Sequence, residues 1–319
     1  MKKKNVFVVL FALAMVMAGS LLCGNAAPQI DRDSASSVAE TAAVASANVK
    51  QLEGAGTVND PYLIYNEEDL NDIRNYATYQ PGPRNYAIYG IFEIKRTINL
   101  TQKWIPIEYP FYGTLEGNYY SINEMTIDIY GAGNYGLFES NYGFIQNLTI
   151  SGLEIGAISA AYGSLINFGA FAGINYATIS ECELHNSSII LNSYYGSSLG
   201  GITGQSFSGG YISNCTVSST CSLISSGWLG GITAYVKQST VIGCKNQATV
   251  EYRKASNSCP VGGIAGGVQI FGKVMNCVNS GTIRTTEAGG EIGGIFGRWD
   301  QSGSIINNTQ EGTIQYNVS

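Results

Sequence analysis

Few residues of this 319-residue sequence have side chains suited to proton transfer or nucleophilic attack. His185 is the single histidine, so a catalytic triad or a multi-histidine metal site would have one candidate base or ligand. It ends the strand-like segment 181–185, and we expect it to be a solvated turn residue. Histidine-dependent catalysis is therefore not predicted.

Carboxylates are the other groups to consider, because glycosidases cleave sugars with a pair of acidic side chains. No aspartate lies between Asp128 and Asp300, and the candidates left near the repeats are Glu139, Glu181 and Glu183. Glu181 and Glu183 alternate and so share one strand face, but no cluster of acids with a basic partner is visible. The sequence therefore predicts no catalytic residue, no metal site and no cofactor, and the protein is more simply read as a non-enzyme.

Tyrosine gives the one hint of a binding surface. The chain has 21 tyrosines, and they gather between Tyr62 and Tyr142. Flat rings with a polar tip suit contacts with sugars or proteins, although packing at the end of the fold is the simpler explanation. The candidate ligand-binding residues are Tyr119, Tyr120, Tyr130, Tyr135 and Tyr142.

The sequence contains a repeat, and the fold that this repeat forms must position these residues. A small-apolar motif recurs with steps of 34, 31, 30, 32 and 31 residues, and a second motif follows each copy after about ten residues. The central residues of the first motif are Leu137, Phe171, Ile202, Ile232, Ile264 and Ile295. Short strands at a constant period, with no helix between them, predict an all-β, right-handed parallel β-helix of about 31 residues and three strands per coil.

The second motif carries two aligned residue types. Cys182, Cys215, Cys244 and Cys277 share one coil position, where stacked residues stand about 4.8 Å apart. A disulfide needs β-carbons about 3.8 Å apart, so we expect free, buried thiols; Cys221 and Cys259 lie outside this column and could pair. The asparagines just before the column suit turns, because asparagine tolerates left-handed backbone. They are Asn147, Asn214, Asn276 and Asn307.

The N-terminal region divides into four parts. Residues 1–26 resemble a signal peptide, with three lysines before an apolar run, and 27–53 read as a flexible linker. A lipoprotein anchored at Cys23 is a weaker alternative, because Leu22 replaces the small residue expected there. Residues 54–130 would form an N-terminal cap and the first coils, and 131–319 the repeat coils. A helix over 66–77, with Asn66 as its N-cap, is the expected capping element.

Charge and hydropathy exclude two classes of partner. The formal net charge is −6, and it becomes more negative once the leader with Lys2–Lys4 is removed, which argues against nucleic acid. Beyond the leader no apolar run reaches the roughly 18–20 residues that a membrane span needs. We therefore expect no nucleic-acid partner and no membrane span. Together with the signal peptide, this predicts a secreted or cell-surface protein.

Three segments resemble a known family. Gly54–Ile64, the Trp104–Ile122 region with Glu116-Gly117-Asn118, and Tyr135–Phe138 followed by Ile145–Leu148 are similar to bacterial surface proteins with GLUG-type repeats. The resemblance covers about residues 54–319 and departs at Tyr119, where a further glycine is usual. It implies a β-helix at the cell surface, in a family whose repeats look like adhesin parts or flank immunoglobulin A peptidases. We see no such catalytic domain in the sequence, so we do not expect enzymatic function to carry over from the family.

The sequence is compatible with three functions. The favoured one is a non-enzymatic, adhesin-like β-helix that binds a host or environmental glycan or protein. The alternatives are a carbohydrate-active β-helix enzyme using Glu139, Glu181 or Glu183, and a structural surface-assembly protein whose last coil pairs end to end with another copy. Exposed strand edges favour such pairing.

Overall fold

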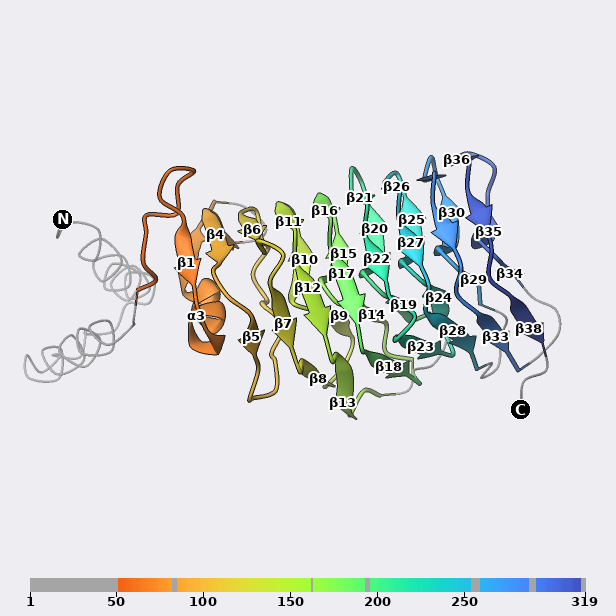
Figure 1. Cartoon of the computed structure of the whole chain (residues 1–319), viewed down its shortest axis with the longest axis horizontal. Helices are drawn as coiled ribbons and strands as arrows, with labels where there is room; N and C mark the ends of the chain where they lie inside the picture. The colour runs from red at the N-terminus through yellow and green to blue at the C-terminus, as the bar shows by residue number, and fades with distance from the viewer. Residues whose placement is uncertain are drawn as a thin grey trace, which may run out of the picture. The chain divides into compact units, whose positions relative to one another are not determined.

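The computed structural model describes residues 51–81, 85–161, 163–192, 196–253, 259–286 and 291–316. The predicted signal peptide, nearly all of the predicted linker and Cys23 lie outside these residues. The compact unit begins at Leu52, which is buried and donates its backbone N–H to the Tyr76 hydroxyl at 2.8 Å. It is a parallel β-solenoid of about eight turns with about 31 residues per turn (Figure 1).

Five parallel sheets run along the solenoid, each built from one strand per coil. Every pairing in them is parallel, and each strand pairs with its equivalent in the next coil. Sheet 1 comprises β1 (Tyr62–Ile64), β4 (Ile91–Ile94), β6 (Thr114–Glu116), β11 (Phe144–Gln146), β16 (Thr178–Ser180), β21 (Tyr211–Ser213), β26 (Thr240–Ile242), β31 (Lys273–Met275) and β36 (Ser304–Ile306). Sheet 2 comprises β5 (Ile98–Asn99), β7 (Ser121–Asn123), β12 (Thr149–Ser151), β17 (Glu183–His185), β22 (Thr216–Val217), β27 (Lys245–Asn246), β32 (Val278–Asn279) and β37 (Thr309–Gln310).

The other three sheets complete each coil. Sheet 3 comprises β8 (Thr126–Ile129), β13 (Glu154–Ile158), β18 (Ser188–Leu191), β23 (Ser222–Ser225), β28 (Thr249–Tyr252), β33 (Ile283–Thr285) and β38 (Ile314–Tyr316). Sheet 4 comprises β9 (Gly133–Tyr135), β14 (Ile166–Phe168), β19 (Ser198–Gly200), β24 (Trp228–Gly230), β29 (Val261–Gly262) and β34 (Ile292–Gly293). Sheet 5 comprises β10 (Phe138–Asn141), β15 (Ala172–Asn175), β20 (Thr203–Phe207), β25 (Thr233–Lys237), β30 (Ala265–Gln269) and β35 (Phe296–Trp299).

The predicted solenoid and its period are confirmed, but the strand count per coil was wrong. The coil that begins at Gly133 contains five short strands, β9 to β13, before the next coil begins with β14 at Ile166, whereas three strands per coil were predicted. One of the extra strands arises within the small-apolar motif. The chain bends inside this motif, so its residues are divided between a strand of sheet 4 and a strand of sheet 5.

The predicted helix lies at the N-terminal side of the solenoid. It comprises α3 (Glu67–Asp72) and the 3-10 turn η1 (Ile73–Tyr76), and the Asn66 side chain caps it by accepting the Asp69 N–H at 3.0 Å. Leu70 and Ile73 on the helix are fully buried. An antiparallel hairpin of β2 (Ala77–Tyr79) and β3 (Tyr86–Ile88) follows.

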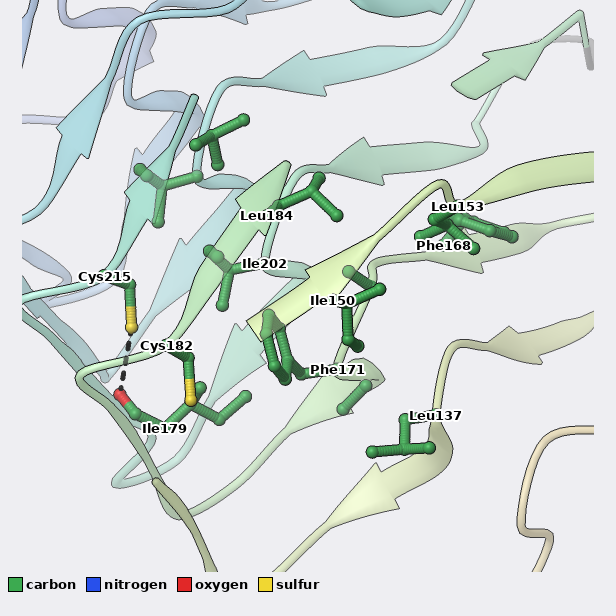
Figure 2. Close-up of a cluster of buried hydrophobic side chains, with 14 of the residues drawn as sticks. Leu137, Ile150, Leu153, Phe168, Phe171, Ile179, Cys182, Leu184, Ile202 and Cys215 are labelled. Carbon is green, nitrogen blue, oxygen red and sulfur yellow. Dashed lines mark hydrogen bonds between the residues drawn. The ribbon is translucent and has the colours of Figure 1, made fainter. Parts of the chain in front are cut away.

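Like residues stack inside the coils. The central motif residues Leu137, Phe171 and Ile202 are fully buried in successive coils (Figure 2). The cysteine column is buried as predicted, and its thiols point to backbone carbonyls; Cys215 Sγ lies 3.6 Å from the Ile179 oxygen. All six cysteines of the described residues, Cys221 and Cys259 included, are free and buried.

The asparagine column forms left-handed turns between sheets 1 and 2. Asn147, Asn214, Asn276 and Asn307 have φ of 53°, 52°, 54° and 52°. Asparagine is among the few non-glycine residues that adopt this conformation readily. Tyr119, in the equivalent turn of an earlier coil, also has a positive φ of 61°, a conformation that glycine adopts more readily than tyrosine.

Candidate functional site

Three hollows lie along the corner where sheets 4 and 5 meet. The first, about 330 Å³, is lined by β9, by Glu139 of β10 and by the segment 103–108. The second adjoins it and shares Glu108, Asn134 and Glu139. The third lies further along the solenoid, where Ser198 and Trp228 of sheet 4 face Gln205, Tyr235, Gln269 and Arg298 of sheet 5.

Asp128 organises one wall of the first hollow. Its carboxylate accepts hydrogen bonds from the Lys103 ammonium at 2.7 Å, from the Ala157 N–H at 2.7 Å and from the Tyr130 hydroxyl at 3.0 Å. The Lys103 bond above all, together with the Ala157 N–H, holds the pKa of Asp128 below its ordinary value. The Tyr130 ring is 73% exposed and is held by its hydroxyl, so it offers ring surface beside the hollow.

Trp104 and Arg74 form another part of the lining of the first hollow. The indole is buried and donates to the Leu137 carbonyl at 3.1 Å, while the Arg74 guanidinium lies 5.6 Å from the indole centre. Arg74 also donates to the Ile105 carbonyl at 2.9 Å and pairs with Glu108 at 3.5 Å. This part of the lining is therefore fixed by contacts from the capping helix to the next coil.

Two carboxylates stand side by side in this hollow. Ile107 pairs in parallel with Phe138, so the next residues, Glu108 and Glu139, occupy equivalent places in adjacent coils. Burial first, and the nearby Glu108 charge second, raise the pKa of Glu139 to about 7. The Glu139 backbone N–H donates to the Ile107 carbonyl at 3.0 Å, but its side chain makes no hydrogen bond or ion pair with any residue that the structure describes, whereas the Glu108 side chain pairs with Arg74.

A row of side chains on sheet 4 runs from the first hollow to the third, and Ser198 within it is buried. Asn134, Asn167, Ser198 and Trp228 occupy one ladder position in four successive coils. Asn167 donates to the Asn134 side chain at 2.9 Å. Three coil steps separate Asn134 from Trp228, about 14 Å at the usual strand spacing of about 4.8 Å. We call these four residues the sheet 4 row.

The third hollow combines aromatic rings with amide and hydroxyl groups. The Arg298 guanidinium lies 5.1 Å from the Trp228 ring centre, and Tyr235 meets the same ring edge-on at 5.1 Å. Tyr235 donates to Gln269 at 2.9 Å, and Gln205 donates to Ser198 at 2.8 Å.

The absence of a side chain at Gly267 makes room for the Trp228 indole. A β-carbon there would lie 2.6 Å from the ring, closer than real contacts allow. Gly267 on sheet 5 therefore determines where the Trp228 indole, the main aromatic surface of this hollow, can lie.

A second aromatic feature, the tyrosine column, consists of Tyr89, Tyr112, Tyr142 and Tyr176. Successive ring centres lie 5.4, 4.9 and 4.5 Å apart, and the planes differ by 17°, 21° and 11°. Stacked rings cover one another's faces, so the column presents mainly ring edges and hydroxyl groups to a ligand. We assign it a packing role.

The five tyrosines predicted to bind a ligand fall into three places. Tyr130 and Tyr135 line the first hollow. Tyr142 belongs to the tyrosine column. Tyr119 and Tyr120 lie in the turn between β6 and β7, on the corner between sheets 1 and 2. The structure therefore brings together two of the five.

Of the other candidates from the sequence, Glu139 lines the first and second hollows, whereas Glu181, Glu183 and His185 lie outside them. Glu181 sits in a left-handed turn and accepts from the Asn214 side chain at 2.8 Å. Glu183, on sheet 2, contacts His185 at 2.7 Å, and His185 ends its strand rather than lying in a turn. In the described ranges no three His, Cys, Asp or Glu side chains gather where they could hold a metal ion.

Sequence reasoning missed Glu108, Asp128 and Trp228. Glu108 had a usable signal, since it precedes Glu139 by 31 residues (139 − 108), one repeat period. Asp128 and Trp228 gave no such signal, because their environment depends on the corner between sheets 4 and 5.

Comparison with known proteins supports the fold and little more. No protein-family model matches the chain, and no curated protein matches it. Among solved structures it is similar to a Bacteroides ovatus protein named in its crystal structure as a "putative immunoglobulin A1 protease", with a TM-score of 0.57 and 18% identity over 83% of this chain and 79% of that one. At this identity the likeness shows a shared β-solenoid fold. No helix in the described part of the chain is long and apolar enough to cross a membrane.

Proposed function

We propose that this protein is a secreted or cell-surface β-solenoid of the GLUG-repeat kind that binds an extended carbohydrate chain along the sheet 4 row, in an adhesin-like role. The observation that carries the proposal is the polar row that runs between two aromatic-lined hollows. A site limited to one hollow would suit a small molecule, whereas a connected row about 14 Å long suits a chain.

The groups along the row match what sugars need. Sugar rings have apolar faces that pack on aromatic rings and hydroxyl groups that bond to amides and carboxylates. Tyr130 and Trp228 supply ring surface near the two ends, and Asn134, Asn167 and Gln205 supply amides between and around them. Binding by many modest contacts is what an adhesin-like surface protein requires.

The surface setting rests on the sequence. The segment 1–26 resembles a signal peptide, and the repeats resemble those of bacterial surface proteins. A peptide ligand is less favoured, because peptide binding to a sheet commonly uses a free strand edge, and the hollows lie on strand faces.

The test is glycan binding by the folded protein. Isothermal titration with pectin, alginate and mucin glycans should show binding to at least one polymer, and Trp228→Ala or Tyr130→Ala should weaken it by about tenfold, or about 1.4 kcal/mol. Tyr119→Ala is the matched control, since it removes an exposed tyrosine from another corner and should leave affinity unchanged. Binding to none of the polymers, or loss of binding only in the Tyr119 variant, would contradict the proposal.

One observation favours a second candidate, end-to-end assembly. In the last complete coil that the structure describes, Ile295 and Phe296 are partly exposed, whereas their equivalents Ile264 and Ala265 are fully buried. A second copy stacked there would cover these side chains. Sedimentation equilibrium should then show a mass that rises with concentration and falls back to a monomer in Phe296→Glu; a constant monomer mass would reject assembly.

A further inference from the structure

Glu139 has properties that carbohydrate binding alone does not require. It lies on β10 in the first hollow and is partly buried, and its carboxyl group has no hydrogen bond or ion pair with the residues that the structure describes. A binding carboxylate is usually ionised and paired. An unpaired carboxyl group in a hollow, with its proton retained near neutral pH, is suited to donating that proton.

Glu108 supplies the complementary group. It lies in the preceding coil, directly after Ile107, whose carbonyl accepts the Glu139 N–H at 3.0 Å, and Arg74 pairs with it at 3.5 Å. Retaining glycosidases work with two carboxyl groups about 5–5.5 Å apart, one that donates a proton and one that attacks as a nucleophile. The surroundings of the two groups differ, because Arg74 pairs with Glu108, whereas the Glu139 side chain has no cationic partner among the described residues.

We propose that Glu139 and Glu108 form a glycoside-cleaving pair, with Glu139 as the proton donor and Glu108 as the nucleophile, acting on the carbohydrate chain that lies along the sheet 4 row. This inference rests on the proposed function, since the first hollow must hold a sugar for the pair to act. It goes beyond an adhesin-like role, and it restores one of the alternatives that the sequence left open.

The reaction balances with water as the second reactant. The Glu139 O–H donates its proton to the glycosidic oxygen as the bond to the anomeric carbon breaks, and the Glu108 carboxylate forms an ester bond with that carbon. The freed sugar leaves with a hydroxyl group. Water then attacks the anomeric carbon, gives one proton to the Glu139 carboxylate, and releases Glu108 as the ester bond breaks.

The surrounding side chains position the sugar for this chemistry. Both Tyr130 and Trp104 line the hollow, where Tyr130 is held by its 3.0 Å hydrogen bond to Asp128 and Trp104 by its 3.1 Å hydrogen bond to the Leu137 carbonyl. Asp128 is committed to Lys103, Tyr130 and the Ala157 N–H, so it is a positioning residue.

The experiment measures binding and cleavage on the same samples of the full chain. Pectin, alginate and mucin glycans are incubated with the wild type, Glu139→Gln, Glu108→Gln and Glu183→Gln, and reducing ends are counted. Any polymer that binds should be cleaved by the wild type and by Glu183→Gln. Glu139→Gln and Glu108→Gln should each lower the rate at least 100-fold while still binding the polymer. The wild-type rate should fall as pH rises above about 7, where Glu139 loses its proton.

The outcomes separate the two proposals. A polymer that binds without release of reducing ends overturns the glycoside-cleaving pair and leaves carbohydrate binding standing. Cleavage that survives in both Glu139→Gln and Glu108→Gln also overturns the pair. Absence of binding to every polymer rejects both proposals. Retention of the anomeric configuration in the first product, read by NMR, supports Glu108 as nucleophile, and inversion overturns that assignment.

Discussion

Replacing Asn141 by alanine tests whether buried side-chain ladders hold the coils together. Asn141 is fully buried, and its amide donates to the Asn175 side chain at 2.8 Å and to the Thr178 carbonyl at 3.1 Å. Its oxygen accepts the Gly143 N–H at 3.1 Å. Alanine leaves that N–H without its acceptor in a dry interior, which costs about 2 kcal/mol, and the lost amide bonds add about 1 kcal/mol.

The expected cost of about 3 kcal/mol corresponds to a Tm lower by roughly 6–12 °C for a domain of this size. Circular dichroism melting is the assay. Asn123→Ala is the matched control, because it removes one inter-coil amide bond, to Asn99 at 2.7 Å, from a solvent-exposed ladder and should shift Tm by about 1 °C. Equal shifts for the two variants would refute the reasoning, since they would show that burial of the ladder adds nothing.

Three further predictions concern pH, thiols and backbone strain. Because its folded-state pKa is raised, protonated Glu139 stabilises the fold fully below about pH 4.5, and this stability is lost as pH rises through about 7; Glu139→Gln should flatten that part of a Tm-against-pH curve. Burial raises the pKa of Cys215 and Cys244 well above the ordinary value, so iodoacetamide at pH 8 should label neither until the protein is unfolded. Tyr119→Gly relieves a left-handed tyrosine and should raise Tm by about 1–3 °C; an unchanged or lower Tm would contradict this.

The coil could be predicted from the sequence because its determinants repeat. Leu137, Phe171 and Ile202 are equivalent, buried and about one period apart, so each copy supports the assignment of the others. The asparagine turns and the buried cysteines followed from the same alignment. The number of strands per coil did not, since bends inside a small-apolar motif depend on contacts between sheets rather than on side-chain alternation.

The candidate site was harder to predict because it is made of unlike residues from separate segments. Arg74 comes from the capping helix region, Glu108 from an irregular segment, and Asp128 and Glu139 from sheets 3 and 5. Nearness in sequence grouped Tyr119 with Tyr130, although they lie on different corners. Grouping by repeat position would have paired Glu108 with Glu139 and aligned Tyr112, Tyr142 and Tyr176.

The fixed register of the sheet 4 row also bears on how such a protein can change during evolution. Asn167, Ser198 and Trp228 follow one another at whole-coil steps of 31 and 30 residues. An in-frame loss or duplication of one repeat between Asn134 and Trp228 would preserve every ladder and move the two hollows closer or further apart by one strand spacing, about 4.8 Å. Unequal recombination among the repeats would therefore adjust the length of ligand spanned in discrete steps, without new residues having to evolve.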